Sequence, residues 1–228
     1  MNRITQFDAF YFSNADTQMG HLLEINGYSI IFGNKHFNFD QLLDYVSTNQ
    51  LHTSFMNQQH TDIILSTPLN DSIVCDGLQT ANISEALVVR TADCLPLVAI
   101  SNTDIAILHC GRKGLLGGIL DQLYSKSLQT PYHSFYIGPH IHAQSYEIGS
   151  TLFQEIQQSY PQSQALQVLN DRHCFCLSTF AREQLQAHFP LAQIFELKID
   201  TFTDQNYNSY RRDQQTQERN LSLVWKKG

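Results

Sequence analysis

Two histidines and one cysteine, His60, Cys94 and His109, are the residues of this chain best suited to metal chemistry. They stand at the ends of apolar runs that we predict to be strands. Two imidazoles and a thiolate suit a borderline-soft ion such as zinc, and three protein ligands leave a fourth position open for water or substrate. Copper accepts the same ligands, so ligand type alone does not exclude it. The three residues lie far apart in the sequence, and spacing alone does not distinguish a metal site from a buried cysteine and two satisfied histidines.

Short strands and amphipathic helices are the elements that would position these residues. Apolar runs predict strands at residues 27–32, 61–66, 86–90, 95–100, 105–109, 134–137, 194–199 and 221–225. The polar tetrapeptide 101–104 predicts a hairpin turn. Apolar spacing predicts helices at 39–46, 115–128, 146–160 and 179–188. Because strands come in groups with helices between them, we predict an α+β fold, in which one layered domain spans residues 1–228 and mixed β-sheets are flanked by helices.

The composition indicates a soluble globular protein. Of the 228 residues, 42% are hydrophobic and 15% charged, which supplies a core. The net charge is −7 and the basic residues are scattered, which argues against a nucleic-acid-binding surface. We find no apolar run long enough to span a membrane and no secretory signal at the N-terminus. Five cysteines without such a signal predict reduced thiols and a cytoplasmic location.

Several motifs together resemble the YfiH family, also called the laccase-domain family. The most specific part is Thr91-Ala92-Asp93-Cys94-Leu95-Pro96 followed by His109-Cys110-Gly111. Further segments follow in the order and spacing of the family: Gln59-His60, Asp76-Gly77-Leu78-Gln79-Thr80, Ile137-Gly138-Pro139-His140-Ile141, Tyr146-Glu147-Ile148-Gly149 and Asn208-Ser209-Tyr210-Arg211-Arg212-Asp213. The resemblance covers roughly residues 55–225, whereas the N-terminal part of the chain is divergent.

Members of this family have been labelled polyphenol oxidases and, more recently, purine nucleoside phosphorylases. The resemblance implies a zinc ion held by His60, Cys94 and His109, which would form the catalytic centre. It also implies a compact YfiH-like α+β domain. The implied activity is phosphorolysis of adenosine, inosine and 5′-methylthioadenosine, together with adenosine deamination. The partners would be a purine nucleoside with phosphate or water, without nucleic acid or membrane, and the protein would be a monomer or homodimer.

The chain departs from the family pattern outside the expected metal ligands. Where the family has His-Ala-Gly-Trp-Arg-Gly, this chain carries Cys110, Arg112 and Lys113 in place of Ala, Trp and Arg. The usual Gly-Pro-Cys carries His140, which we expect to be a core or surface histidine and not a fourth ligand. The family's Thr-Gly-Arg is replaced by the segment 216–219. These changes fall on substrate and phosphate contacts.

Three cations, Lys113, Arg211 and Arg212, are the expected substrate contacts. Lys113 lies at the start of a predicted helix, where backbone N–H groups favour anions; the alternative is a solvated cation on a Gly-rich turn. Guanidinium groups suit bidentate phosphate recognition. Adjacent residues of a strand point to opposite faces, so we expect at most one of the two arginines to reach the site. Asp93 has two candidate roles, as an acceptor that orients an imidazole ligand or as a turn cap.

Four functions are compatible with these residues. The first is a zinc-dependent purine nucleoside enzyme, in which the metal polarises substrate or activates water. A copper-dependent polyphenol oxidase fits less well, because multicopper oxidation requires many histidine ligands and only three ligands are convincing. A metal-free cysteine hydrolase would use Cys94 as nucleophile and His109 or His60 as base. A non-catalytic nucleoside-binding protein would explain the altered loop.

Overall fold

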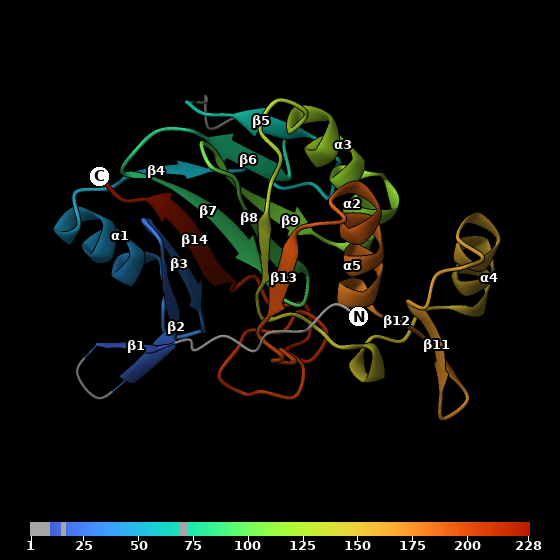
Figure 1. Cartoon of the computed structure of the whole chain (residues 1–228). Coiled ribbons are helices and arrows are strands. Elements are labelled where there is room, and N and C mark those ends of the chain that lie inside the picture. The colour runs from blue at the N-terminus through green and yellow to red at the C-terminus, as the bar shows by residue number, and fades with distance from the viewer. Residues whose placement is uncertain (1–9, 15–16, 69–72) are drawn as a thin grey trace.

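Two six-stranded β-sheets form the centre of the molecule (Figure 1). The computed structural model describes residues 10–14, 17–68 and 73–228. The first sheet has the strand order β1-β2-β3-β14-β7-β4, and only β4 and β7 in it pair in parallel. Its strands have the following bounds: β1 Phe10–Asn14, β2 Thr17–Ile25, β3 Tyr28–Gly33, β4 His52–Phe55, β7 Glu85–Thr91 and β14 Asn220–Lys226.

The second sheet has the strand order β13-β10-β8-β9-β6-β5. The pairs β5–β6 and β10–β13 are parallel and the others antiparallel, so this sheet is also mixed. Its strands have these bounds: β5 Ile64–Ser66, β6 Gly77–Thr80, β8 Leu95–Ile100, β9 Ile105–Cys110, β10 Ser134–Ile137 and β13 Gln193–Glu196. A separate antiparallel pair is formed by β11 Leu166–Leu169 and β12 Arg172–Phe175.

Helices cover the outer faces of the two sheets. The helix α1, Phe39–Thr48, is capped by Asn38, whose side chain accepts the backbone N–H of Gln41, and it packs on the first sheet. On the outer side of the second sheet lie α2 Arg112–Leu116, α3 Ile119–Lys126 and α5 Leu177–His188 (Figure 1). The short 3₁₀ helix η1 Ala143–Ser145 and α4 Ser150–Ser159 stand beside β11 and β12. No helix in the described part of the chain is long and apolar enough to cross a membrane.

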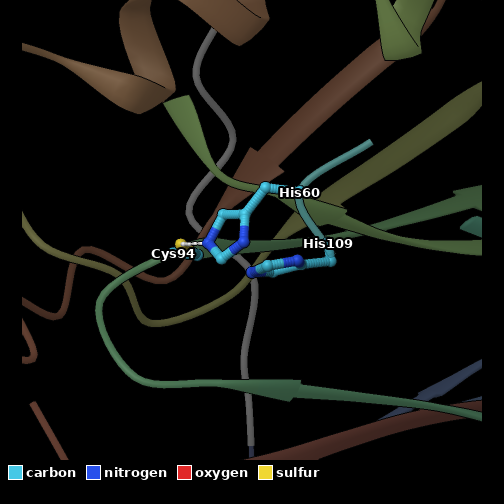
Figure 2. Close-up of side chains that lie close together, drawn as sticks. All are labelled: His60, Cys94 and His109. Carbon is cyan, nitrogen blue, oxygen red and sulfur yellow. Dashed lines mark hydrogen bonds between the residues drawn. The ribbon is translucent and has the colours of Figure 1, made fainter. Parts of the chain in front are cut away.

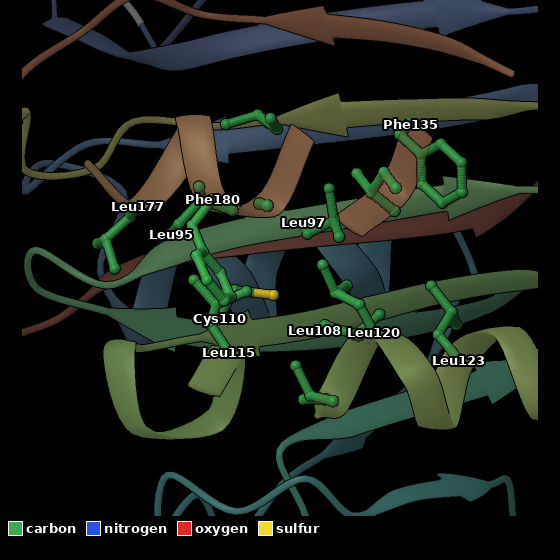
Figure 3. Packing of buried hydrophobic residues seen from close by; sticks show 14 of the residues in the cluster. Leu95, Leu97, Leu108, Cys110, Leu115, Leu120, Leu123, Phe135, Leu177 and Phe180 are labelled. Atoms are coloured by element: carbon green, nitrogen blue, oxygen red, sulfur yellow. The ribbon is translucent and has the colours of Figure 1, made fainter. Parts of the chain in front are cut away.

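The order of layers is therefore helix, sheet, sheet, helices, and each boundary between layers is an apolar cluster. Between the sheets, side chains such as Leu87 and Val89 meet Val98 and Ile107. On the other side of the second sheet, strand residues pack on α2, α3 and α5, as Figure 3 shows for Leu95, Leu97, Leu108, Leu115, Leu120 and Phe180. Because β8 and β9 are covered on both faces, every residue in them is buried, which is why they read as unbroken apolar runs.

The predicted layered α+β fold with mixed sheets is confirmed, with corrections to individual elements. A single helix over 115–128 is wrong: α2 ends at Leu116 and α3 begins at Ile119. Gly118 between them has φ +95°, a left-handed conformation that glycine adopts without strain. The helix predicted to begin at residue 146 begins at Ser150. Apolar runs did not predict β1, β2, β4, β6, β11 or β12, which mix polar with apolar residues.

Candidate metal centre

The three expected ligands come from three segments that the second sheet brings together. Cys94 directly precedes β8, and His109 is the penultimate residue of β9. These strands are antiparallel neighbours, with Leu95 opposite Cys110 and Pro96 opposite His109, so the two side chains lie at the same end of the sheet. His60 lies in the loop between β4 and β5 and reaches the same point.

In this cluster the ligand atoms of His60, Cys94 and His109 all lie within 4.8 Å of one another. Figure 2 shows the three side chains turned toward each other, with His60 Nε2 3.7 Å from Cys94 Sγ. The two imidazole rings cross at 66° with centroids 4.7 Å apart. The sequence prediction that these residues form one group is thus matched by the geometry of the fold.

A buried carboxylate, Asp76, fixes two of the three ligands. Its Oδ1 accepts the ring Nδ1–H of His109 at 2.7 Å and the backbone N–H of His60 at 3.0 Å. Its Oδ2 accepts from the backbone of Gln59 and from both the backbone and the hydroxyl of Thr61. Because Nδ1 of His109 is engaged, its Nε2 is left for the cluster. This is the arrangement that orients a metal-binding histidine in many proteins.

Asp76 holds His60 through the backbone. His60 has φ +61°, a left-handed conformation that a residue with a Cβ rarely adopts. Three consecutive N–H groups, those of residues 59–61, converge on the carboxylate and keep the loop in this shape. Burial raises the pKa of Asp76, but the bonds from His109 and from the loop outweigh it and lower the pKa to about 2. The carboxylate is therefore ionised and acts only as an acceptor.

The role that we considered for Asp93 belongs to Asp76 instead. The Asp93 carboxylate accepts from the Thr201 hydroxyl and from the backbone N–H of Arg211, both at 2.8 Å, and not from an imidazole. Asp93 has φ +83° in the tight turn before Cys94. It ties this turn to the C-terminal segment that carries Arg211.

The donor set fits a small, borderline-soft cation. Burial disfavours the Cys94 thiolate, but the neighbouring imidazoles outweigh this effect and lower the pKa of Cys94 to about 6. Burial also disfavours the His109 imidazolium, but Cys94 and Asp76 raise the pKa of His109 to about 9. Gly111 leaves room for the cluster, because a Cβ there would lie 2.7 Å from His60 Cδ2 and 3.1 Å from Cys94 Sγ. A thiolate, two imidazoles and a buried orienting carboxylate match a site for a transition-metal ion.

A cavity of about 590 Å³ opens beside the three ligands. This is within the usual volume of a small-molecule site, roughly 300–1,000 Å³. Its lining includes three arginines, Arg90, Arg211 and Arg219. The aromatic rings of Tyr146 and Tyr210 also line it. Cationic, aromatic and metal-binding groups therefore face one space.

Of the three expected substrate contacts, Arg211 alone lines the cavity. Its guanidinium lies over the Tyr146 ring, 5.0 Å from the centroid, and Nη1 donates to the Glu147 carbonyl. Arg212 is turned away and does not line the cavity. Its donors are used by Asp213 and by the backbone carbonyls of residues 201, 202, 204 and 207.

Lys113 is exposed on α2 and also lies outside the cavity lining. The geometry thus gives no support to substrate contact by Lys113 or Arg212. Conversely, sequence reasoning did not assign Arg90 or Arg219 to the site. Arg219 stands at the end of the segment that replaces the family's Thr-Gly-Arg, and Arg90 comes shortly before Cys94, so both had a weak signal in the sequence.

The chain is similar in sequence to one family model and to several named proteins. A family model described as "Multi-copper polyphenol oxidoreductase laccase" matches residues 35–227. The chain is 32% identical over 181 residues to a protein of Campylobacter jejuni named purine nucleoside phosphorylase, covering 76% of each chain. It is 30% identical over 142 residues to the purine nucleoside phosphorylase YfiH of Escherichia coli, covering 60% of this chain and 58% of that protein.

Two solved structures share the fold. YlmD from Geobacillus stearothermophilus superposes with a TM-score of 0.82 at 17% identity, covering 97% of this chain and all of that one. The hypothetical protein YfiH of Bacillus licheniformis gives a TM-score of 0.80 at 20% identity, covering 94% and 98% of the two chains. The family model matches most of the length of the chain. The chain therefore belongs to the laccase-like YfiH family, which is a metal-binding family.

Proposed function

We propose that this chain is a zinc-dependent purine nucleoside enzyme. It cleaves adenosine, inosine and 5′-methylthioadenosine by phosphorolysis and also deaminates adenosine. The observation that carries the proposal is the convergence of His60, Cys94 and His109 on a cavity lined by three arginines and two tyrosines. The names of the relatives from Campylobacter jejuni and Escherichia coli support the substrate class.

His60, Cys94 and His109 would hold the zinc ion. When bound, such an ion acts as a Lewis acid at its open position, either on an oxygen or nitrogen atom of the substrate or on a water molecule. Zinc is favoured over copper because oxidation of phenols by multicopper enzymes needs several copper ions. In the described part of the chain this cavity is lined by one His/Cys triplet.

The arginines supply the phosphate site. Arg211 is held by its bond to the Glu147 carbonyl and by the bond of its backbone to Asp93, which leaves the rest of its guanidinium for a ligand. Arg219 is anchored through Nη1 on carbonyls of its own loop. Guanidinium groups fixed in this way bind phosphate oxygens in pairs and place one of them for attack.

The walls of the cavity supply the nucleoside site. Tyr210 offers an aromatic ring to a purine, and Tyr146 carries the Arg211 guanidinium over its ring. The amide side chains of Gln58 and Gln217 offer donors and acceptors to the purine edge or to the ribose. In phosphorolysis a phosphate oxygen forms a bond to C1′ while the bond from C1′ to the purine nitrogen breaks. The electron pair goes to the purine, which is then protonated. In deamination, water adds at C6 of adenine and ammonia leaves.

The test is phosphate-dependent release of hypoxanthine from inosine by purified, zinc-replete protein, with adenosine and 5′-methylthioadenosine assayed in parallel. Cys94→Ala should lose the zinc ion of the His60, Cys94 and His109 centre together with turnover, whereas Cys176→Ala, which removes a half-buried thiol outside the cluster, should retain both. No turnover of any of the three nucleosides by the zinc-replete protein would refute the proposal.

The same samples separate the alternatives. Activity that survives chelation but not thiol alkylation would indicate a cysteine hydrolase that uses Cys94. Several copper ions per chain with phenol oxidation would indicate an oxidase. Tight nucleoside binding without turnover would indicate a binding protein.

A further inference from the structure

A second group of potential metal ligands lies away from the cavity: His140, His142 and Glu196, which we call the His140 cluster. One ligand atom from each of the three lies within 4.8 Å of the other two. His140 and His142 belong to the segment that follows β10, and Glu196 is the last residue of β13. Because β10 and β13 are parallel neighbours, with Ile137 opposite Glu196, this segment and Glu196 meet at the same end of the sheet.

His140 presents a buried nitrogen with no hydrogen-bond partner in the described structure. The residue is 1% exposed. Its Nδ1 lies 2.9 Å from the Gly138 carbonyl, which can only accept, so Nδ1 carries the proton. In the neutral ring Nε2 is therefore a free lone pair, buried and unpartnered. A buried polar atom without a partner is destabilising, so a native structure needs a reason to keep one.

His142 repeats this feature. Its Nε2 is also buried and without a partner among the described residues. The two rings lie with centroids 5.1 Å apart, and the cluster gathers their ligand nitrogens around one point. Neither nitrogen has the other as a hydrogen-bond partner among the described residues. A cation between them would satisfy both.

Glu196 adds a negative oxygen that is already held in place. Its Oε2 accepts from Nε and Nη2 of Arg182, at 3.2 and 2.7 Å. Its Oε1 lies 3.8 Å from His140 Nε2, which is too long for a hydrogen bond. The Glu196 side chain is 9% exposed. Arg182 therefore fixes the carboxylate, with Oε1 on the side of His140.

The His140 cluster is distinct from the first centre. Ile141 lines the cavity, and residues two apart in an extended segment share a face. His140 and His142 thus point to the side opposite Ile141, away from the cavity. The expectation that His140 is not a fourth ligand of the first centre agrees with this placement, but a simple core histidine would not explain the free nitrogens.

We propose that His140, His142 and Glu196 form a second site, which binds a divalent transition-metal ion such as zinc. Two imidazoles and one carboxylate are an established ligand set for zinc and for non-haem iron. Metal–ligand bonds of about 2.0–2.2 Å place tetrahedral ligand atoms about 3.3–3.6 Å apart, so Glu196 Oε1 and His140 Nε2 need to approach by only a few tenths of an ångström. The ion would join the segment behind Ile141 to β13 and so stiffen this wall of the cavity.

Cobalt(II) distinguishes the two sites, because a thiolate ligand gives a charge-transfer absorption in the near ultraviolet and a His/His/Glu set does not. Metal-free full-length protein titrated with cobalt(II), and separately with zinc, should bind two ions per chain, one with this band and one without. Cys94→Ala should bind one ion without the band. His142→Gln should bind one ion with the band, and the control His52→Gln, which removes an exposed imidazole, should bind two.

Thermal denaturation gives a second readout. Zinc should raise the Tm of Cys94→Ala protein and should no longer raise it after His142→Gln or Glu196→Gln is added. If wild-type protein binds a single ion and Cys94→Ala binds none, the proposal is overturned, and the two nitrogens are then hydrogen-bonded to solvent. Neither result depends on nucleoside turnover, so a failure here is distinguishable from a failure of the proposed function.

Discussion

Replacing Asp76 by Asn tests how the first centre is held without touching a ligand. The two carboxylate oxygens accept five hydrogen bonds, two at Oδ1 and three at Oδ2. An amide has one accepting oxygen. In either orientation of the introduced amide its NH₂ group would face N–H or O–H donors and could not accept from them. Asp76→Asn therefore loses at least two of these bonds in either orientation, and one orientation also loses the partner of His109.

Hydrogen bonds to a charged group contribute about 1.5–3 kcal/mol each, so Asp76→Asn should lower the free energy of unfolding by about 3 kcal/mol or more. Loss of the acceptor that orients a ligand imidazole usually lowers metal affinity by about 10–100-fold. Here the effect should lie toward the upper end, because Asp76 positions both His109 and the left-handed backbone of His60. Zinc affinity would be measured by competition with a chromophoric chelator, under conditions in which the variant is folded.

Glu85→Gln is the matched control, because Glu85 is also a buried carboxylate but lies away from the cluster. It accepts from Ser54, Thr80 and Asn82, each at 2.8 Å. This variant should lose stability and keep wild-type zinc affinity. If Asp76→Asn is destabilised in the same way and still binds zinc with wild-type affinity, the reasoning that one carboxylate organises the centre is refuted.

Three further outcomes follow from named contacts. Gly111→Ala should lower zinc affinity at least tenfold while every ligand is retained, because the new Cβ meets the side chains of His60 and Cys94; unchanged affinity in the same competition assay would contradict this. Arg212→Gln should lower the free energy of unfolding by about 2–4 kcal/mol in urea, since it removes a charged donor from several backbone carbonyls, and should leave zinc content unchanged. Burial raises the pKa of Glu85, but the surrounding donors outweigh it and lower the pKa below its usual value. Its stabilisation should therefore be complete above about pH 5 and fall as the pH drops through the folded-state pKa. The difference in free energy of unfolding between wild type and Glu85→Gln, measured in urea from about pH 6 to about pH 3, should be constant above about pH 5 and should shrink below it.

The sequence allowed several strands, and the meeting of Cys94 with His109, to be predicted because each lies in a local pattern. β8 and β9 are apolar along their whole length, and Cys94 and His109 stand at their ends. Antiparallel pairing across a short turn then leaves little freedom in where the two side chains meet. His60 needed the resemblance, because nothing in its own loop shows that it reaches the sheet.

Other parts of the site depend on contacts between distant residues, which no local pattern records. Asp76 acts through bonds to residues 15–33 positions away. Arg211 and Arg212 differ in role because they lie in a turn, where one guanidinium is captured by backbone carbonyls and the other remains at the cavity. The alternation rule for strands predicted that one of the two would be excluded, but it could not say which.

The two-part helix after β9 shows a third kind of limit. The apolar spacing of residues 115–128 suits a continuous helix, yet consecutive glycines permit the turn at Gly118. Packing of α2 and α3 against the second sheet then determines the break. Helix propensity alone does not tell whether this packing outweighs the stability of one continuous helix.

The central claim is that one metal centre at the cavity supports phosphorolysis of purine nucleosides. The most direct measurement is the rate of hypoxanthine release from inosine, with and without phosphate, on one sample of native protein before chelation, after chelation and after addition of zinc. The account predicts phosphate-dependent release that is lost on chelation and restored by stoichiometric zinc. Release that persists in fully metal-free protein, or no release from the zinc-loaded protein at any phosphate concentration, would contradict it.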